Sequence, residues 1–541
     1  MRAVHLLPAL VALAMPAFAA EPAKAPDVTA RIIDAGMNHG EVALTAEYLT
    51  DRIGGRIPNS PAMRVAERWA QGKFRNWGLA NVHAEPFLFG RGWSIDAINV
   101  RMTAPRVLTL RAIPIAFTPG TGGPVTADII VAPMAKEADF TRWQGKLKGR
   151  IVLLSKPGEG SEPDKPAFQR MGDDELRKLD RFDQPVTDSA SAERRVKRNL
   201  FDAKLDAFLK AEGAVAWVRQ SYRDGGLLHG EGYGYRLEDR RQTPGIELAA
   251  EDYRRLARLA VRDVPGAAER VTLEIDSRVT FQEADPNANN IIADLPGSDP
   301  AAGYVMAGAH FDSWVAADGA ADNGAGSVVV MEAARILASL GVKPRRTIRF
   351  ALWNAEEQGL LGSVAYIDRH LAKRPPETDP EKIKAGDWAG WGRRWPVTPG
   401  AEYGQLAAYF NLDNGSGKIR GIYTEGNAGV APIFREWLAP FAAMGATAVV
   451  TSRTGGTDHV FMQSVGLPGY QFIQDPLDYM SRTHHSSVDT FDHLKLADLR
   501  QAAVIMASFL WNAANRPEPL PRLLPTKPTE TNPFVYRDEE D

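Results

Sequence analysis

Hydrophobic and polar positions alternate in three different ways along the chain, and each pattern predicts a different kind of structure. Residues 27–77 place apolar side chains at helical spacing among charged ones, which predicts amphipathic helices. From about residue 106 to 279, short apolar runs such as "ADIIVAP", "GRIVLLSKPGEG" and "GAVAWVRQ" predict strands, and "AAEDYRRLARLAV" predicts a helix. From residue 287 to 516, apolar strands alternate with helical patterns, which predicts a mainly parallel sheet flanked by helices.

Three further segments do not fit these patterns. The charged stretch 162–197 predicts a loop-rich connection. Residues 373–405 are rich in Pro, Gly and Trp, and we interpret them as a surface insertion that packs its own aromatic side chains, with a lid or interface loop as the alternative. The Pro-rich segment 517–541 predicts an extended tail.

Composition narrows the possible partners and ligands. The chain has 541 residues and a formal net charge of −3, and it shows no basic run of the kind expected for nucleic acid or an anionic membrane. Its length predicts more than one domain. Because the chain has no cysteine, disulfides and thiolate chemistry are excluded, and any metal site must use His, Asp and Glu.

The N-terminal residues "MRAVHLLPALVALAMPAFAA" have the pattern of a secretory signal. Arg2 precedes an apolar run from Val4 to Met15, and small residues follow at Ala17 and Ala19. The run is shorter than the ~20 apolar residues that span a membrane, so we expect a cleaved signal and favour it over a retained anchor. We therefore predict a secreted or periplasmic protein without a membrane anchor.

Polar residues with metal-binding side chains follow the apolar strands of the third region. His310 ends the strand of "YVMAGAHFDS", and Glu356 and Glu357 follow the strand of "TIRFALWNAEE". Asp413 follows the strand of "LAAYFNLDN", and Asp322 lies in the Gly-rich turn "ADGAADNGAG" before a helix of 3.6-residue period. Ligands of open α/β sheets bind beyond the carboxyl ends of the strands, so we expect these side chains to gather there.

Such a gathering of carboxylates would raise their pKa values by mutual repulsion unless a cation compensated their charge. Carboxylate and imidazole ligands without sulfur favour zinc, with manganese or cobalt as alternatives. A single aspartate at a strand end is usually a helix cap or a surface residue. The prediction of a metal site therefore rests on the whole set.

Four motifs occur in the order and style of a known family: "GAHFDSW…DGAADNGAG", "WNAEEQGLLGS", "NLDNGSG" and "HHSSVDT". The chain resembles the zinc exopeptidases that include bacterial and fungal aminopeptidases and glutamate carboxypeptidases, most of all the plasma glutamate carboxypeptidase (carboxypeptidase Q) branch. The likeness covers about residues 287–513 and the N-terminal helices. Residues 106–279 resemble the protease-associated domain that is inserted in many members.

The resemblance implies an α/β fold, with a mainly parallel mixed sheet flanked by helices and an inserted β-rich protease-associated domain. The implied domain order is a signal peptide (1–20), the N-terminal part of the peptidase domain (21–105), the protease-associated domain (106–279), the catalytic domain (280–516) and the Pro-rich tail (517–541). We expect the inserted domain to narrow access to the site and to add no chemistry. Relatives often dimerise, so a homodimer is a possible assembly.

The resemblance also assigns roles to the metal-binding residues. Asp322 would bridge two Zn²⁺ ions, with His310 and Asp413 completing one site and Glu357 and His485 the other. Glu356 would be the general base that takes a proton from the attacking water and passes it to the leaving amine.

The adjacent histidines need separate roles. Neighbours on an extended strand face opposite sides, so one metal should not bind both His484 and His485. The family pattern fits His485 as the ligand. His484 then contacts the substrate carbonyl or developing oxyanion, or is structural. Asp312 either orients the His310 imidazole or caps a turn. We expect the other histidines to be structural, including His370, His459 and His493.

The predicted function is hydrolysis of small peptides at one end by an aminopeptidase or dipeptidase. A carboxypeptidase like the glutamate carboxypeptidases is the alternative. A non-catalytic receptor-like module of the same fold is a weaker one, because all five ligands and the base are present. A third alternative is another metal hydrolase on this scaffold, such as a phosphoesterase or a glutaminyl-cyclase-like enzyme.

Overall fold

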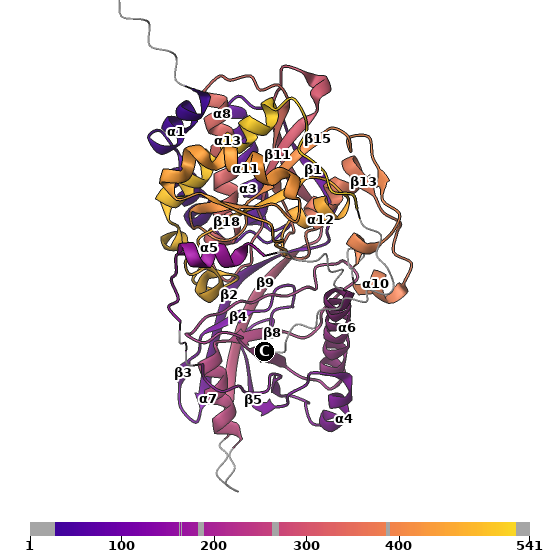
Figure 1. Ribbon diagram of the computed structural model, residues 1–541. Helices are drawn as coiled ribbons and strands as arrows, with labels where there is room; N and C mark the ends of the chain where they lie inside the picture. Colours follow the sequence, from indigo (N-terminus) through magenta and orange to yellow (C-terminus); the bar gives the residue numbers. More distant parts are fainter. Residues whose placement is uncertain are drawn as a thin grey trace, which may run out of the picture.

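The computed structural model describes residues 27–525, apart from Glu162, Asp164, 182–188, 262–269 and 386–389. Within these ranges the chain forms two eight-stranded sheets with helices packed on them, and a small two-stranded sheet of β13 (Ala372–Lys373) and β14 (Thr398–Pro399) (Figure 1). The predicted signal peptide and residues 526–541 of the tail lie outside the described residues. No helix in the described ranges is long and apolar enough to cross a membrane.

The first sheet combines strands from both ends of the chain. In spatial order its strands are β1 (Ala80–Leu88), β10 (Asn287–Leu295), β12 (Thr347–Trp353), β11 (Tyr304–His310), β15 (Leu406–Asn411), β18 (Gly469–Gln474), β16 (Ile419–Tyr423) and β17 (Ala448–Val450). β11 runs parallel to both β12 and β15, and β15 runs parallel to β18. The pairs β1–β10, β10–β12 and β16–β18 are antiparallel. The predicted mixed sheet with a parallel centre is confirmed.

Helices cover both faces of this sheet because successive strand residues point to opposite sides. On one face Val305 and Ala307 pack in a core with α1 (Val28–Met37), α2 (Val42–Glu47), α3 (Pro61–Asn76), α8 (Ala325–Ser339), α11 (Ala431–Leu438) and α13 (Leu496–Asn515). On the other face Tyr304 and Met306 pack with residues of α9 (Leu361–Tyr366) and α12 (His459–Ser464). This double cover explains the continuous apolar runs of the central strands.

The second sheet is made from residues 92–282. Its spatial order is β3 (Leu108–Thr109), β2 (Gly92–Ala104), β9 (Thr272–Gln282), β5 (Val125–Val131), β6 (Ile151–Leu153), β7 (Ala216–Gln220), β8 (Gly245–Leu248) and β4 (Ala112–Pro114). It begins before the predicted boundary at residue 106, because β2 pairs antiparallel with β9 from Gly92↔Gln282 to Ala104↔Thr272. The predicted strands β5, β6 and β7 and the helix α7 (Ala250–Ala260) are confirmed.

The charged stretch 162–197 is more regular than the sequence predicted. It contains α5 (Asp173–Leu179) and the start of α6 (Ser189–Ala211). Leu176 of α5 packs with Val450 and Ile473 of the first sheet, and Leu209 of α6 packs with residues of the second. A charged helix with so few apolar positions shows only weak hydrophobic periodicity, so these two helices were not predicted. Their stability depends on these tertiary contacts.

The insertion 373–405 contains α10 (Pro380–Ala385) and a short turn of 3₁₀ helix, Trp391–Arg393. Trp391 is buried and meets Phe461 edge-on at 5.3 Å between ring centroids, with the Arg374 guanidinium 5.2 Å from its ring. α10 contacts α6, so the insertion lies against the second-sheet region (Figure 1). Trp388 lies outside the described residues.

Candidate metal centre and active site

The predicted site residues come together beyond the carboxyl ends of β11, β12 and β15. His310 is the last residue of β11, and the segments after the other two strands carry Glu356, Glu357 and Asp413. Asp322 lies in the turn that precedes α8, and the histidine pair follows a π-helical turn at Tyr479–Thr483. Apart from His310, which is buried, all of the predicted residues line one cavity of about 680 Å³.

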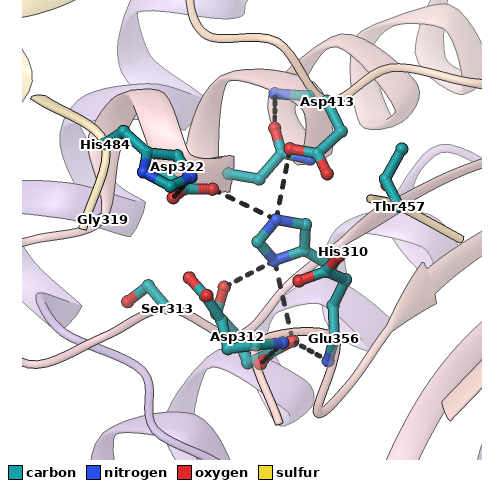
Figure 2. A network of polar contacts seen from close by, with 12 residues as sticks. His310, Asp312, Ser313, Gly319, Asp322, Glu356, Asp413, Thr457 and His484 are labelled. Carbon is teal, nitrogen blue, oxygen red and sulfur yellow. Dashed lines mark hydrogen bonds and ion pairs between the residues drawn. The ribbon is translucent and has the colours of Figure 1, made fainter. Parts of the chain in front are cut away.

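Asp322 lies between two groups of side chains. Its Oδ1 is 3.3 Å from Nε2 of His310, and its Oδ2 is 3.3 Å from Nε2 of His485. The His310 Nε2 is also 3.3 Å from Oδ1 of Asp413, and the His485 Nε2 is 3.0 Å from Oε2 of Glu357. Two clusters therefore share Asp322. We call them the His310 cluster (His310, Asp322, Asp413) and the His485 cluster (His485, Asp322, Glu357); Figure 2 shows the first.

The electrostatics of these clusters match those of a cation site. Burial, together with the charge of Asp322, raises the pKa of Glu357 to about 7. Burial and the charges of Asp413 and Glu357 raise the pKa of Glu356 well above its ordinary value. Burial also opposes ionisation of Asp322, but its contacts with the histidines lower its pKa. Buried carboxylates at such spacing need positive charge nearby.

Three carboxylate oxygens of the two clusters are buried and make no hydrogen bond within the described chain: Asp322 Oδ2, Glu357 Oε1 and Asp413 Oδ1. Buried polar atoms normally have a partner, and an ion is one reason for an apparent exception. Oxygen and imidazole nitrogen donors at this spacing fit zinc. The residues therefore fit the metal that the sequence predicted.

His310 is held from within its own segment. Its Nδ1 is 3.0 Å from the main-chain carbonyl oxygen of Asp312 and 3.7 Å from the Asp312 carboxylate. The carboxylate instead accepts the main-chain N–H groups of Glu356 and Glu357, at 3.1 and 3.3 Å. Asp312 thus orients the imidazole through its backbone and fixes the turn after β12 through its side chain (Figure 2).

The histidine pair does not lie on an extended strand, so the prediction that the two rings face opposite sides is wrong. His485 has φ 60°, in the left-handed region, and the two rings stack at 3.7 Å between centroids. The turn directs both side chains to the same side, toward Asp322 Oδ2. His485 Nε2 lies 3.3 Å from this oxygen and His484 Nε2 lies 3.9 Å from it. Burial lowers the pKa of His484, which favours its neutral form.

Three residues that support the site were missed in the sequence. The carboxylate of Asp489 accepts hydrogen bonds from the main-chain N–H groups of Ala321 and Asp322. This residue stands in the motif "HHSSVDT", but no role was predicted for it. The buried guanidinium of Arg56 donates to carbonyls of the loops before and after Trp314. Glu231, from the second-sheet region, contacts Nδ1 of His485 at 2.9 Å. Glu231 could not be recognised from the sequence, because it lies far from every motif.

The remaining histidines make contacts away from the cavity wall. His370 lies between Glu85 and Glu402, at 2.8 and 3.1 Å. His493 Nδ1 is 2.7 Å from Asp478, and His459 is fully buried near Glu425. None of the three lines the site cavity, although Gly455–Thr457, just before His459, do.

Parts of the insertion and of the second-sheet region also reach the cavity. Trp391 and its neighbouring glycines line it, so this insertion does more than pack its own aromatic side chains. Arg198 of α6 and Tyr233 of the second-sheet region line it from another side. The cavity is therefore lined by segments from three separate parts of the sequence.

Comparison with known proteins concerns the part of the chain that carries this site. Residues 290–510, which carry every predicted site residue, match Peptidase family M28. This part of the chain is therefore similar to peptidase family M28. The metallo-exopeptidase that the sequence resemblance predicted is confirmed. The chain is 24% identical to carboxypeptidase Q of Mus musculus over 88% of its own length and 86% of that protein.

Solved structures share the fold across both sheets. A Peptidase M28 precursor from Shewanella amazonensis is 23% identical, with a TM-score of 0.64 over 92% of this chain and 98% of that one. A zinc aminopeptidase from Bacillus subtilis is 19% identical, with a TM-score of 0.54 over 88% and 94% of the two chains. The second-sheet region is therefore included in the shared architecture.

Proposed function

We propose that this exopeptidase works like the M28 enzymes that it resembles, holding two zinc ions and removing the N-terminal residue of short peptides, as an aminopeptidase or dipeptidase. The observation that carries the proposal is Asp322, whose two oxygens face two different histidines at 3.3 Å. A carboxylate shared in this way suits a pair of metal ions. His310 and Asp413 would hold one zinc, and Glu357 and His485 the other.

Glu356 is the best candidate for the general base. It lines the cavity beside the ligands and is not part of either cluster. Burial raises its pKa, which makes its carboxylate a stronger base. Bound zinc would supply Lewis-acid polarisation of the scissile carbonyl and activation of the attacking water. Glu356 would take a proton from that water and give it to the leaving amine.

His484 is positioned to assist from the cavity wall. Its lowered pKa keeps the ring neutral near pH 7, and a neutral imidazole can still donate one N–H. Such a donor stabilises an oxyanion that develops on the substrate carbonyl. We therefore assign His484 to the oxyanion and not to the metal, because its Nε2 is 3.9 Å from Asp322 while that of His485 is 3.3 Å away.

Arg198 is a candidate for binding the free C-terminal carboxylate of a short substrate. It is the only Lys or Arg among the described residues that line the cavity. No carboxylate in the described ranges forms an ion pair with it, and its guanidinium lies 5.3 Å from the Tyr233 ring. The C-terminal carboxylate of a dipeptide is the group that Arg198 would attract, since a guanidinium binds a carboxylate through paired N–H donors.

The test is hydrolysis by the mature protein with added zinc. The substrates are a free dipeptide, an aminoacyl amide and an N-blocked dipeptide with a free C-terminus. Glu356→Gln is the control, and it should lose about 10²–10⁴-fold in kcat while keeping its zinc. Cleavage of the first two substrates identifies an aminopeptidase, and cleavage of the dipeptide alone identifies a dipeptidase. Silence on all three by protein shown to hold two zinc ions would refute a peptidase of this kind.

The carboxypeptidase alternative is favoured by the carboxypeptidase Q relatives and by Arg198 itself. Cleavage of the N-blocked dipeptide would establish it. Arg198→Gln sharpens the result, because a charge-assisted contact contributes about 1.5–3 kcal/mol. We expect KM for the dipeptide to rise about 10- to 100-fold and KM for the aminoacyl amide to stay unchanged.

A further inference from the structure

The second-sheet region reaches the proposed metal site through Glu231. The Glu231 Oε1 is 2.9 Å from Nδ1 of His485, the ring nitrogen that faces away from Asp322 and Glu357. The two side chains are 18% and 20% exposed, so both are largely withdrawn from water. Glu231 comes from the loop between β7 and β8, which is 254 residues from His485 in sequence.

The same loop is attached to the histidine turn at several other points. Arg223 donates to the carbonyl of His484 at 2.8 Å. The main-chain N–H of Ser487 donates to the carbonyl of Leu228 at 2.8 Å, and the Leu228 N–H donates back to the Ser487 hydroxyl at 3.1 Å. These bonds join residues 223–228 to residues 484–487. The position of Glu231 relative to His485 is therefore fixed by backbone contacts as well as by its own bond.

Glu231 is itself held in place. The Tyr222 hydroxyl donates to the same Oε1 at 3.0 Å, and the charge of Arg219 lies near enough to stabilise the carboxylate. No other described side chain bonds to the His485 Nδ1. The His310 cluster needs no such remote partner, because the carbonyl of Asp312 performs that task two residues away.

We propose that Glu231 is a positioning residue that fixes the ring orientation and tautomer of His485, so that Nε2 is presented to zinc. The proposal rests on the zinc site of the proposed function. A carboxylate that accepts Nδ1–H leaves the Nε2 lone pair free for the metal and increases its basicity. The second-sheet region then contributes to zinc affinity and does not merely narrow access to the cavity.

The experiment measures zinc affinity of the full-length mature protein by competition with a chromophoric chelator. Loss of an outer partner of a metal-binding histidine lowers metal affinity about 10- to 100-fold. We expect Glu231→Ala to weaken one of the two zinc sites by this factor and to leave the other unchanged. Glu231→Gln keeps an acceptor oxygen and should lose less. Glu274→Ala is the control, since it removes a partly buried carboxylate of β9 that pairs with Arg101 and not with a residue of the metal site.

A double-mutant cycle assigns the effect to His485. His485→Ala removes the same zinc site, so adding Glu231→Ala to it should change nothing further. Additive losses, or equal weakening of both sites by Glu231→Ala, would overturn the proposal. Unchanged zinc affinity of folded Glu231→Ala would overturn it too, and Glu231→Gln provides the same comparison if the alanine variant does not fold. Because the readout is zinc, a wild-type protein that binds two ions and cleaves no peptide would refute only the proposed function.

Discussion

The two clusters that share Asp322 are built in different ways. The His310 cluster uses the last residue of β11 and a residue just after the neighbouring β15, and His310 is oriented by a carbonyl two residues away. The His485 cluster uses a turn with a left-handed residue, and its histidine is oriented by a carboxylate 254 residues away. One half of the site therefore depends on the strands of the first sheet, while the other depends on a contact between a loop of the second-sheet region and the histidine turn.

Removing the shared carboxylate should affect both clusters at once. Asp322→Asn keeps the size of the side chain but loses the charge that both histidines face. We expect kcat/KM to fall by about 10³-fold or more, because metal stabilisation of the transition state is worth several kcal/mol. Zinc titration should show that both sites are weakened. Loss of a single zinc would contradict the bridging role.

A substitution of His484 should lower catalysis without loss of zinc from the His485 cluster. His484→Phe keeps a ring that can stack on His485 but removes the N–H donor. We expect kcat to fall by about 10²–10³-fold, as for loss of one oxyanion donor, with two zinc ions still bound. If the variant binds only one zinc, His484 is a ligand and our assignment of the pair is wrong.

A carboxylate change in the His310 half should have a smaller effect than Glu231→Ala has in the other half. Asp312→Asn leaves the main-chain carbonyl that bonds His310 Nδ1 in place. We expect zinc affinity to fall by less than about tenfold, below the usual range for loss of such a partner. A loss as large as that of Glu231→Ala would show that the Asp312 carboxylate, and not its carbonyl, orients the ring.

Without zinc, the stability of the folded protein should depend modestly on pH, because the ionisable side chains of the two clusters titrate differently in the folded and unfolded states. In the metal-free protein the pKa of Glu357 is raised to about 7 from its ordinary value near 4.5, so the folded state binds this proton more tightly than the unfolded state. Stability is therefore fully present below pH 4.5 and is lost as pH rises through about 7. The raised pKa values of His310 and His485 extend the loss to higher pH.

Thermal unfolding of chelator-treated protein at pH 5.5 and pH 7.5 measures this effect. We expect a lower Tm at pH 7.5, and a smaller difference between the two pH values in Glu357→Gln. Added zinc should remove most of the difference, because the cation offsets the carboxylate charge. An unchanged pH dependence in Glu357→Gln would show that this carboxylate does not titrate differently on folding.

Much of the His310 half could be predicted from the sequence. The apolar runs predicted β11, β12 and β15. The polar residues that follow these strands were expected to lie close together, because parallel strands have their carboxyl ends at the same edge of the sheet. The helix after Asp322 was predicted from its 3.6-residue period, and it ends at Ser339 as the following glycine indicated. Local patterns suffice where the backbone of one sheet places the side chains.

The contribution of the second-sheet region could not be predicted in this way. Glu231 and Arg198 lie in segments without a local motif, and α6 has a charged sequence with little apolar period. The boundary at Gly92 was missed because β2 is largely half-buried or exposed, so its apolar pattern is weak. Glu231 reaches the site only through the contacts between the loop 222–231 and the turn that carries His484 and His485.

The sequence by itself determined the two kinds of strand pattern, the residues able to bind a metal and their places at strand ends, since these depend on side-chain chemistry and local periodicity. Only the tertiary structure decided that both adjacent histidines face Asp322, that Trp391 and Arg198 line the cavity, and that Glu231 contacts His485. The physical reason is that each of these depends on a backbone turn or on a contact between distant segments, and neither leaves a periodic signal in the chain.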